Sequence, residues 1–326
     1  MMVLLVLKER MRAFYARFSP LVNGLTRFAL SLAALWMMRV GLGYMALLTN
    51  PLVMVALSLV CAFLPFGAIS LVLAAVMLGH IYTASFEIAL LLGVFLVIVA
   101  LLYYGFHPGD SCWLILTPIA FALKVPFVIP LLAGLSGGLL GIIPVSCGIV
   151  VYYILSYVRQ NVGVLTNDAS VDITQKYVQI IRALVSNRTM LVFIIACAAG
   201  ILVTCLVRRL ALDYAWIFAI IIGYVSQLAV IFAGDFVLDI SVPAGELIFG
   251  SVFALAIAGL FHFFVFAVDY SRTEYINFED DDYVYYVKAV PKIMVSAPDV
   301  RVQRINDPAR ARRGGRPSER SGSGER

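Results

Sequence analysis

Apolar and polar residues alternate in long blocks along the chain as far as about residue 268, where the apolar blocks end. Several blocks exceed about 18 apolar residues, enough for a helix to cross a hydrocarbon core of roughly 30 Å. We expect crossings at 24–48, 51–64, 66–83, 86–106, 137–158, 190–207, 213–233 and 246–268. The pattern therefore predicts an all-α integral membrane bundle of about eight transmembrane helices. Because 51–64 is short, 51–83 forms either two crossings or one hairpin that dips in from outside.

The block at 113–158 is apolar but too rich in helix-breaking residues to form one regular helix. It contains four prolines, a cluster of glycines and one basic residue: Pro118, Pro126, Pro130, Pro144, Gly134, Gly137, Gly138, Gly141 and Lys124. Proline removes a backbone donor and clashes with the preceding turn. In a membrane, broken backbone survives only where protein or a water-filled cavity covers it. We predict a broken or re-entrant segment at 113–136 that enters from the cytoplasmic side, turns near Lys124–Pro130 and leaves on the same side.

The distribution of charge predicts the orientation of the bundle, because Lys and Arg favour the cytoplasmic side of a membrane. Arg208 and Arg209 mark a cytoplasmic end, whereas the loop 234–245 carries Asp235 and Asp239 but no basic residue and should face out. Counting crossings from these loops places both termini in the cytoplasm. We read the net charge of +5 in the same way, as a signal of orientation.

Two segments outside the apolar blocks have an amphipathic pattern. Residues 1–20 combine apolar positions at helical spacing with bases, which predicts a cytoplasmic amphipathic helix before a transmembrane domain at 21–268. The alternative is that this segment is the basic flank of a long first helix. The polar insert 159–189 places Ile173, Tyr177 and Leu184 on one helical face, which predicts an external amphipathic helix.

After the last crossing the chain changes character twice. Residues 273–279 and 283–290 are β-prone runs on either side of three aspartates, which predicts a small cytoplasmic β-hairpin within a tail at 269–296. An isolated hairpin is marginal in water, so we expect it to pack against the bundle or to add to a partner's sheet. The candidate docking residues are Glu274, Tyr275, Asp280, Asp281, Asp282, Tyr285 and Tyr286. Residues 297–326 are rich in Arg, Gly, Ser and Pro, which predicts disorder.

Composition narrows the possible functions. Hydrophobic residues make up 62% of the chain and charged residues 13%, far from the balance of a soluble domain. The five cysteines show no CxxC or Cys/His ligand spacing, so we expect reduced, packed thiols and no metal. The sequence contains no HExxH motif, no Walker A motif and no Ser–His–Asp ordering at a nucleophile elbow. We therefore expect no enzyme, no cofactor and no nucleic-acid partner.

The broken segment supplies the candidate pathway for a solute or an ion. An ammonium group at membrane depth is costly, so Lys124 either faces a polar cavity, pairs with Glu87 or snorkels to an interface. The glycines either let ions approach backbone carbonyls or allow helices to pack closely. The candidate pathway residues are Lys124, Glu87, Thr117, Gly134, Gly137, Gly138 and Ser146.

Four stretches carry a resemblance to a known family. They are Val268-Asp-Tyr-Ser-Arg-Thr-Glu-Tyr-Ile-Asn-Phe-Glu-Asp-Asp-Asp-Tyr, Tyr285-Tyr-Val-Lys-Ala-Val-Pro-Lys292, Asp213-Tyr-Ala-Trp216 and Thr117-Pro-Ile-Ala-Phe121. The chain resembles a family of integral membrane proteins of anaerobic Firmicutes, whose members are sometimes labelled ABC transporter permeases. The resemblance implies a bacterial plasma membrane as the location and implies no particular activity.

Two functions agree with these observations. The broken helices favour a transporter or permease-like subunit for a small solute or ion, driven by a gradient or by a cytoplasmic ATPase. The specific tail and the scarcity of ionisable groups in the membrane segments favour a non-catalytic scaffold or assembly subunit of a cell-envelope complex. In either case the lipid bilayer is a partner, and residues 269–296 are the expected docking site for an ATPase or an envelope protein.

Overall fold

The computed structural model describes residues 2–106, 111–167, 178, 181–182, 185–210, 214–240, 242–266, 274–279 and 284–289. The chain divides into two compact units, each considered by itself below. One consists of residues 1–7 and 268–326, and the other of residues 8–267.

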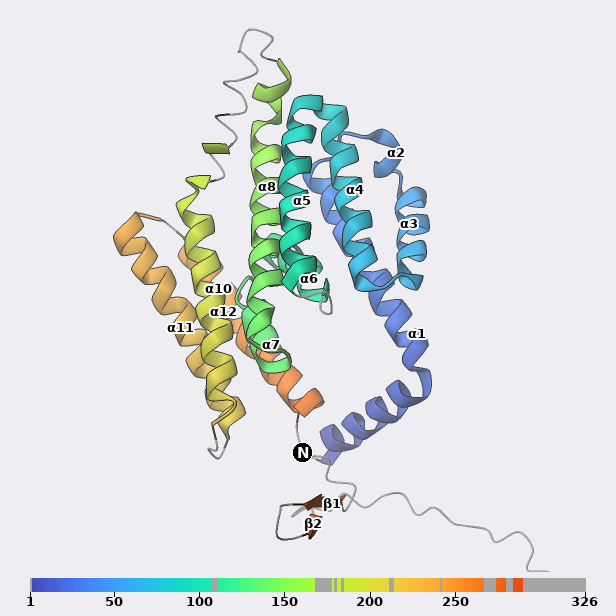
Figure 1. Cartoon of the computed structure of the whole chain (residues 1–326), viewed down its shortest axis with the longest axis vertical. Coiled ribbons are helices and arrows are strands. Elements are labelled where there is room, and N and C mark those ends of the chain that lie inside the picture. Colours follow the sequence, from blue (N-terminus) through green and yellow to red (C-terminus); the bar gives the residue numbers. More distant parts are fainter. Residues whose placement is uncertain are drawn as a thin grey trace, which may run out of the picture. The chain divides into compact units, whose positions relative to one another are not determined.

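The first half of the large unit contains helix α1 (Met2–Gly41) from residue 8 onward, α2 (Ala46–Thr49), α3 (Pro51–Phe63), α4 (Phe66–Ala84) and α5 (Phe86–Phe106) (Figure 1). Local chemistry explains the breaks between them. Gly43 adopts φ +59° just after α1, a conformation that glycine takes without steric cost. Asn50 caps α3 by accepting a hydrogen bond from the backbone N–H of Leu52, and Pro51 occupies the first helical turn. Pro65 precedes α4.

The second half contains α6 (Ser111–Ala122), α7 (Val128–Ser136), a 3₁₀ turn η1 (Leu139–Gly141), α8 (Ile142–Asn167), α10 (Arg188–Val207), α11 (Ala215–Leu238) and α12 (Ala244–Phe261). A π-helical turn, η2 (His262–Phe266), follows α12. Helix α8 is the long central helix of Figure 1, with α5 and α10 packed on either side of it.

Seven helices in the described part of the chain are long and apolar enough to cross a membrane. They are Ala13–Gly41, Phe66–Ala84, Ile88–Gly105, Leu139–Asn161, Arg188–Val207, Ala215–Leu238 and Ala244–Val265. The prediction of an all-α, multi-pass membrane bundle is confirmed. The expected crossing at 51–64 is the 13-residue helix α3. At about 1.5 Å per residue it is too short to span the hydrocarbon core on its own.

The first crossing agrees with one of the two predicted alternatives at its start and differs from the prediction at its end. Helix α1 runs from Met2 to Gly41, which fits a long first helix with a basic flank, but it consists of two helical pieces joined at Phe18, where the backbone angles are non-helical. Pro20 lies two residues further on and has no N–H to donate to the preceding turn, which accounts for a kink instead of an end. The glycines at 41 and 43 end the helix earlier than expected.

The large unit has two hydrophobic cores that share helices α6 and α8. The first core contains residues of α1, α3, α4 and α5 together with Ile115, Ile119, Ile154 and Val158. The second contains residues of α7, α10, α11 and α12 together with Phe121, Val145 and Ile149. Helices α6 and α8 therefore form the seam on which both halves of the bundle pack.

The small unit contains the predicted hairpin. Strands β1 (Glu274–Glu279) and β2 (Val284–Ala289) pair in antiparallel fashion, with Glu274 opposite Ala289 and Glu279 opposite Val284. The acidic turn Asp280–Asp282 and the tail 297–326 lie outside the described residues. Most of the predicted external helix at 159–189 also lies outside them, although α8 extends through its beginning as far as Asn167.

Candidate functional site

The predicted break in 113–136 lies between α6 and α7. The backbone N–H of Lys124 donates to the carbonyl of Phe121 (3.1 Å), and that of Val125 donates to the carbonyl of Ala120 (2.9 Å). This pair of bonds is a Schellman motif, which closes a helix through a residue in the left-handed conformation. Glycine normally occupies that position, but here Lys124 has φ +61°. A lysine therefore holds a conformation that is strained for any residue with a side chain.

The segment turns back at this break. Thr117 of α6 packs against Gly148 of α8, and the ring of Phe121 lies 5.3 Å from that of Tyr152. Residue numbers increase in the same direction along both helices, so α6 and α8 run parallel. Because α8 follows α7 through a short 3₁₀ turn, α7 must return to the end of the bundle where α6 began. The prediction that the helix is broken and turns back near Lys124 is confirmed, and the side of the membrane from which it enters stays a prediction. Only Pro126 lies in the break, whereas Pro118 lies inside α6 and Pro130 in the first turn of α7.

An arginine completes the other end of the re-entrant hairpin. The guanidinium of Arg208 donates to the backbone carbonyl of Gly137 (2.7 Å) and to that of Leu135. The last carbonyls of a helix have no partner within the helix and carry its negative dipole end. Arg208, at the end of α10, therefore satisfies the exposed carbonyls of α7 with a positive charge.

Lys124 forms an ion pair across the tip of the hairpin. Its Nζ lies 2.5 Å from Oε1 of Glu246, in the first turn of α12. The pair lies at the surface of the bundle, because the Lys124 side chain is 63% exposed and that of Glu246 is 39% exposed. The hydrogen bond to Glu246 and the negative charge of that carboxylate raise the pKa of Lys124 above its ordinary value, so the ammonium form is favoured.

Two cavities border this ion pair. The larger, of about 660 Å³, lies between α1, α6, α8 and the start of α12. It is lined by Ala33, Trp36, Met37, Met38, Val40, Gly41, Leu42, Ile119, Phe121, Ala122, Leu123, Lys124, Tyr152, Leu155, Ser156, Arg159 and Glu246. The smaller, of about 160 Å³, reaches towards α10 and shares Phe121, Lys124, Tyr152 and Glu246 with the first. We call the larger one the Lys124 cavity.

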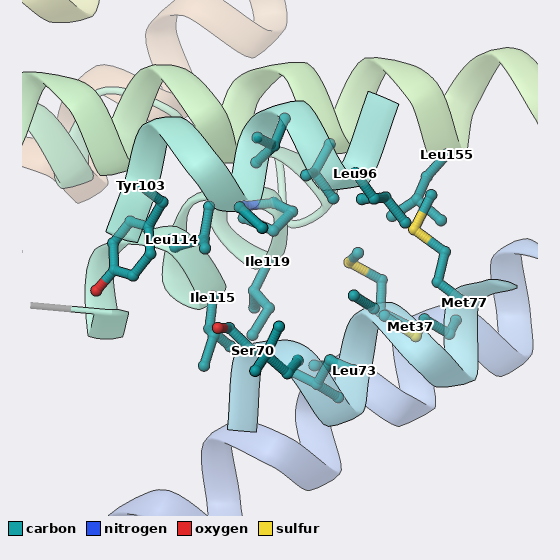
Figure 2. Close-up of a pocket in the computed structure, with 18 of the residues that line it drawn as sticks. Met37, Ser70, Leu73, Met77, Leu96, Tyr103, Leu114, Ile115, Ile119 and Leu155 are labelled. Atoms are coloured by element: carbon teal, nitrogen blue, oxygen red, sulfur yellow. The ribbon is translucent and has the colours of Figure 1, made fainter. Parts of the chain in front are cut away.

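A third pocket lies deeper in the first core and is apolar. Its volume is about 80 Å³. Figure 2 shows it between α1, α4, α5, α6 and α8, with Met37, Met77, Leu96 and Ile119 around it. It contains no charged side chain, so it provides no group that could hold a polar solute.

The structure separates the predicted pathway residues into different roles. The hydroxyl of Thr117 donates to the carbonyl of Trp113 (2.6 Å) and packs against α8. Gly134 makes room for Thr204 of α10, because a Cβ there would lie 2.7 Å from the Cβ of Thr204. The carbonyl of Gly137 binds Arg208. The contact of Gly134 favours the packing alternative for that glycine, whereas a Cβ at Gly138 would meet nothing within 4 Å.

Gly138 and Ser146 do not line the Lys124 cavity. Both lie near the end of the hairpin that Arg208 closes. Glu87 is in the first turn of α5, and its side chain is outside the described set. The carboxylate partner of Lys124 in the structure is Glu246, which the sequence analysis missed. The one feature of the sequence that could have indicated Glu246 is its position, three residues after Pro243 and at the start of an apolar block.

No protein-family model, no curated protein and no solved structure matches the chain. The class of the protein therefore rests on its own helices, and it is a polytopic helical membrane protein. The resemblance to the Firmicutes family stays a prediction.

Proposed function

We propose that the protein transports an anionic solute, which binds at the Lys124–Glu246 pair at the tip of the re-entrant hairpin. The observation that carries the proposal is the position of this ion pair. It lies at a helix break and borders a cavity of about 660 Å³. Interrupted helices that line a polar cavity are typical of the binding sites of membrane transporters.

The strained backbone at Lys124 supports the proposal. Non-glycine residues in the left-handed region are concentrated at functional sites, where the surrounding structure maintains the strain. The Schellman motif keeps Lys124 in this conformation, so the break is a defined structure with its ammonium directed to Glu246.

The charge of the cavity supports an anionic solute. Lys124 and Arg159 contribute two positive charges and Glu246 contributes one negative charge, which leaves one positive charge in excess. Within the described residues Arg159 has no ion-pair partner. An anion would bring this cluster to neutrality, whereas a cation would add to the imbalance.

The proposed orientation places the Lys124 cavity on the outer side. In the predicted topology the loop 234–245 and the insert 159–189 face out; Glu246 directly follows the loop, and Arg159 is the first residue of the insert. The hairpin then enters from the cytoplasm with Arg208 at its base. In this arrangement an external anion reaches Lys124 first.

Uptake into proteoliposomes tests the proposal. The probes are radiolabelled inorganic phosphate, succinate and dodecyl phosphate, with glucose as the uncharged control. We expect protein-dependent uptake of an anion and none of glucose. Lys124→Met should insert normally and abolish uptake, Lys124→Arg should retain part of it, and the control Arg182→Gln should behave like the parent. The proposal is wrong if no anion enters proteoliposomes faster than it enters protein-free liposomes, or if Lys124→Met transports as fast as the parent.

The β-hairpin formed by β1 and β2 supports a second candidate function, that of a scaffold subunit. Tyr286 is 79% exposed within the described residues, and Tyr285 and Val287 are also exposed. Exposed aromatic and aliphatic groups on a two-stranded sheet suit the addition of a partner strand. Deleting residues 297–326 should leave partner recovery intact, whereas deleting residues 269–326 should abolish it while the bundle still inserts. Equal recovery from both truncations would contradict the scaffold function.

A further inference from the structure

We propose that the Lys124 cavity binds an anionic amphiphile, a molecule with a carboxylate or phosphate head and a hydrocarbon chain. The proposal deepens the proposed function by naming the class of ligand at the same site. Binding itself does not depend on transport, so the two can fail separately.

The lining of the cavity is divided by chemistry. One wall belongs to α1 and is apolar, formed by Ala33, Trp36, Met37, Met38 and Val40. The part formed by the end of α6, by α8 and by the start of α12 carries all the charged and hydroxyl groups, those of Lys124, Arg159, Glu246, Tyr152 and Ser156, beside the apolar Ile119, Phe121, Ala122, Leu123 and Leu155. A ligand that satisfies both walls needs a charged end and an apolar body.

The ion pair can exchange its carboxylate for the head of such a ligand. Both side chains are partly exposed, and exposed ion pairs contribute little to stability. Glu246 lies in the first turn of α12, where the helix dipole favours a negative charge even without Lys124. An incoming anion can therefore bind the ammonium of Lys124 and the guanidinium of Arg159 while Glu246 remains stabilised by its own helix.

The size and position of the cavity favour an amphiphile over an inorganic ion. A volume of about 660 Å³ lies within the usual range for pockets that hold organic ligands. Trp36 and Val40, on the apolar wall, are 54% and 64% exposed, so this wall continues onto the surface of α1. A candidate span with exposed apolar residues faces lipid, and tryptophan is enriched at membrane interfaces. A hydrocarbon chain therefore has an apolar route from the bilayer to the charged end.

The chain offers a direct reporter of binding. Its three tryptophans are Trp36, Trp113 and Trp216, and only Trp36 lines the cavity. In a Trp113→Phe/Trp216→Phe background, bromine on the chain of a bound ligand will quench the fluorescence of Trp36 alone. The probes are dodecanoate brominated at its terminal carbon and, as the neutral control, a dodecyl maltoside brominated at the same carbon. Both are added to the protein in maltoside detergent.

We expect saturable quenching by the brominated dodecanoate and only linear background quenching by the neutral probe. Lys124→Met/Arg159→Met should raise the Kd at least about tenfold, because both charge-assisted contacts to the head are lost. The matched control Arg182→Gln removes a base that does not line the cavity and should leave the Kd unchanged. Lys124→Arg, which keeps the charge, should bind with a Kd close to that of the parent.

Competition identifies the source of the ligand. Dodecyl phosphate should displace the probe and inorganic phosphate should not. If a bilayer lipid supplies the head, quenching by the brominated dodecanoate should be weaker in nanodiscs that contain phosphatidylglycerol than in nanodiscs of pure phosphatidylcholine. If phosphatidylglycerol has no effect while dodecyl phosphate still competes, the ligand is a free amphiphile.

Three results would overturn the proposal. They are equal quenching by the two brominated probes, an unchanged Kd in the double variant, and displacement by inorganic phosphate as effective as that by dodecyl phosphate. Saturable binding without uptake of any anion would leave this proposal standing and remove transport alone. Uptake of phosphate or succinate without amphiphile binding would do the reverse.

Discussion

The guanidinium of Arg208 donates a 2.7 Å hydrogen bond to the backbone carbonyl of Gly137, 71 residues earlier in the chain. The bond fixes the returning end of the re-entrant hairpin to the end of α10. An interrupted helix in a membrane survives only if its freed carbonyls find partners. The conformation of α7 therefore depends on a residue outside the hairpin itself.

Arg208→Met should destabilise the bundle, because it leaves the carbonyls of Leu135 and Gly137 without their donor. Hydrogen bonds that involve a charged group contribute about 1.5–3 kcal/mol each, so the melting temperature in detergent should fall by several degrees. Arg209→Met is the matched control, since the side chain of Arg209 is exposed and lies next in sequence. Equal melting temperatures for the two variants would exclude this role for Arg208.

Lys124→Gly should separate stability from function. Glycine adopts φ +61° without strain, so Lys124→Gly should melt at least as high as the parent, and Lys124→Ala should melt a few degrees lower than Lys124→Gly. Both variants remove the ammonium and should lose uptake. The measurements are thermal unfolding and uptake on the same preparations. A lower melting temperature for Lys124→Gly than for Lys124→Ala would show that the backbone strain is not relieved by glycine.

The glycines of the hairpin differ in what they tolerate. A Cβ at Gly134 would lie 2.7 Å from the Cβ of Thr204, whereas one at Gly138 would meet nothing within 4 Å. Overpacking a close contact typically costs about 1–3 kcal/mol. Gly134→Ala should therefore lower the melting temperature and Gly138→Ala should leave it unchanged. Equal effects from the two substitutions would mean that α7 and α10 move apart freely.

The sequence was sufficient to predict the helical bundle, the break after Lys124 and the terminal hairpin, because each depends on local composition. Long apolar blocks, proline with glycine, and alternating β-prone residues all act over short stretches. The extent of α1 was harder to predict, because Pro20 kinks a helix that continues through it. Sequence alone does not decide between a kink and an end.

The partner of Lys124 could not be predicted, because the pairing depends on long-range packing. Glu246 lies 122 residues from Lys124 in sequence, and α12 reaches the tip of the hairpin only when the second core has formed. Glu87 was the more conspicuous carboxylate, being nearer in sequence. Arg208 was interpreted as a marker of orientation, and nothing in its local sequence indicates that it binds α7.

The proposed topology makes a prediction about labelling. Cysteines introduced at Asn167 and Asp239 into a cysteine-free background should react in intact cells with a thiol reagent that cannot cross the membrane. One at Ser321 should react only after the cells are permeabilised. Asp239 is exposed at the end of α11, so the thiol reagent can reach a cysteine at this position. Labelling at Ser321 together with protection at Asp239 would reverse the orientation and place the Lys124 cavity on the cytoplasmic side.

A charge exchange tests whether Glu246 is the partner on which the site depends. Lys124→Glu places two carboxylates at the hairpin tip and should abolish uptake and amphiphile binding, because the head of the ligand then meets two negative charges. Adding Glu246→Lys restores one ammonium and one carboxylate within the same cavity and should recover part of both activities. Adding Glu87→Lys instead should recover neither. If Glu87→Lys is the change that rescues Lys124→Glu, the functional partner of Lys124 is on α5, and the pair at the tip of the hairpin is only a surface contact.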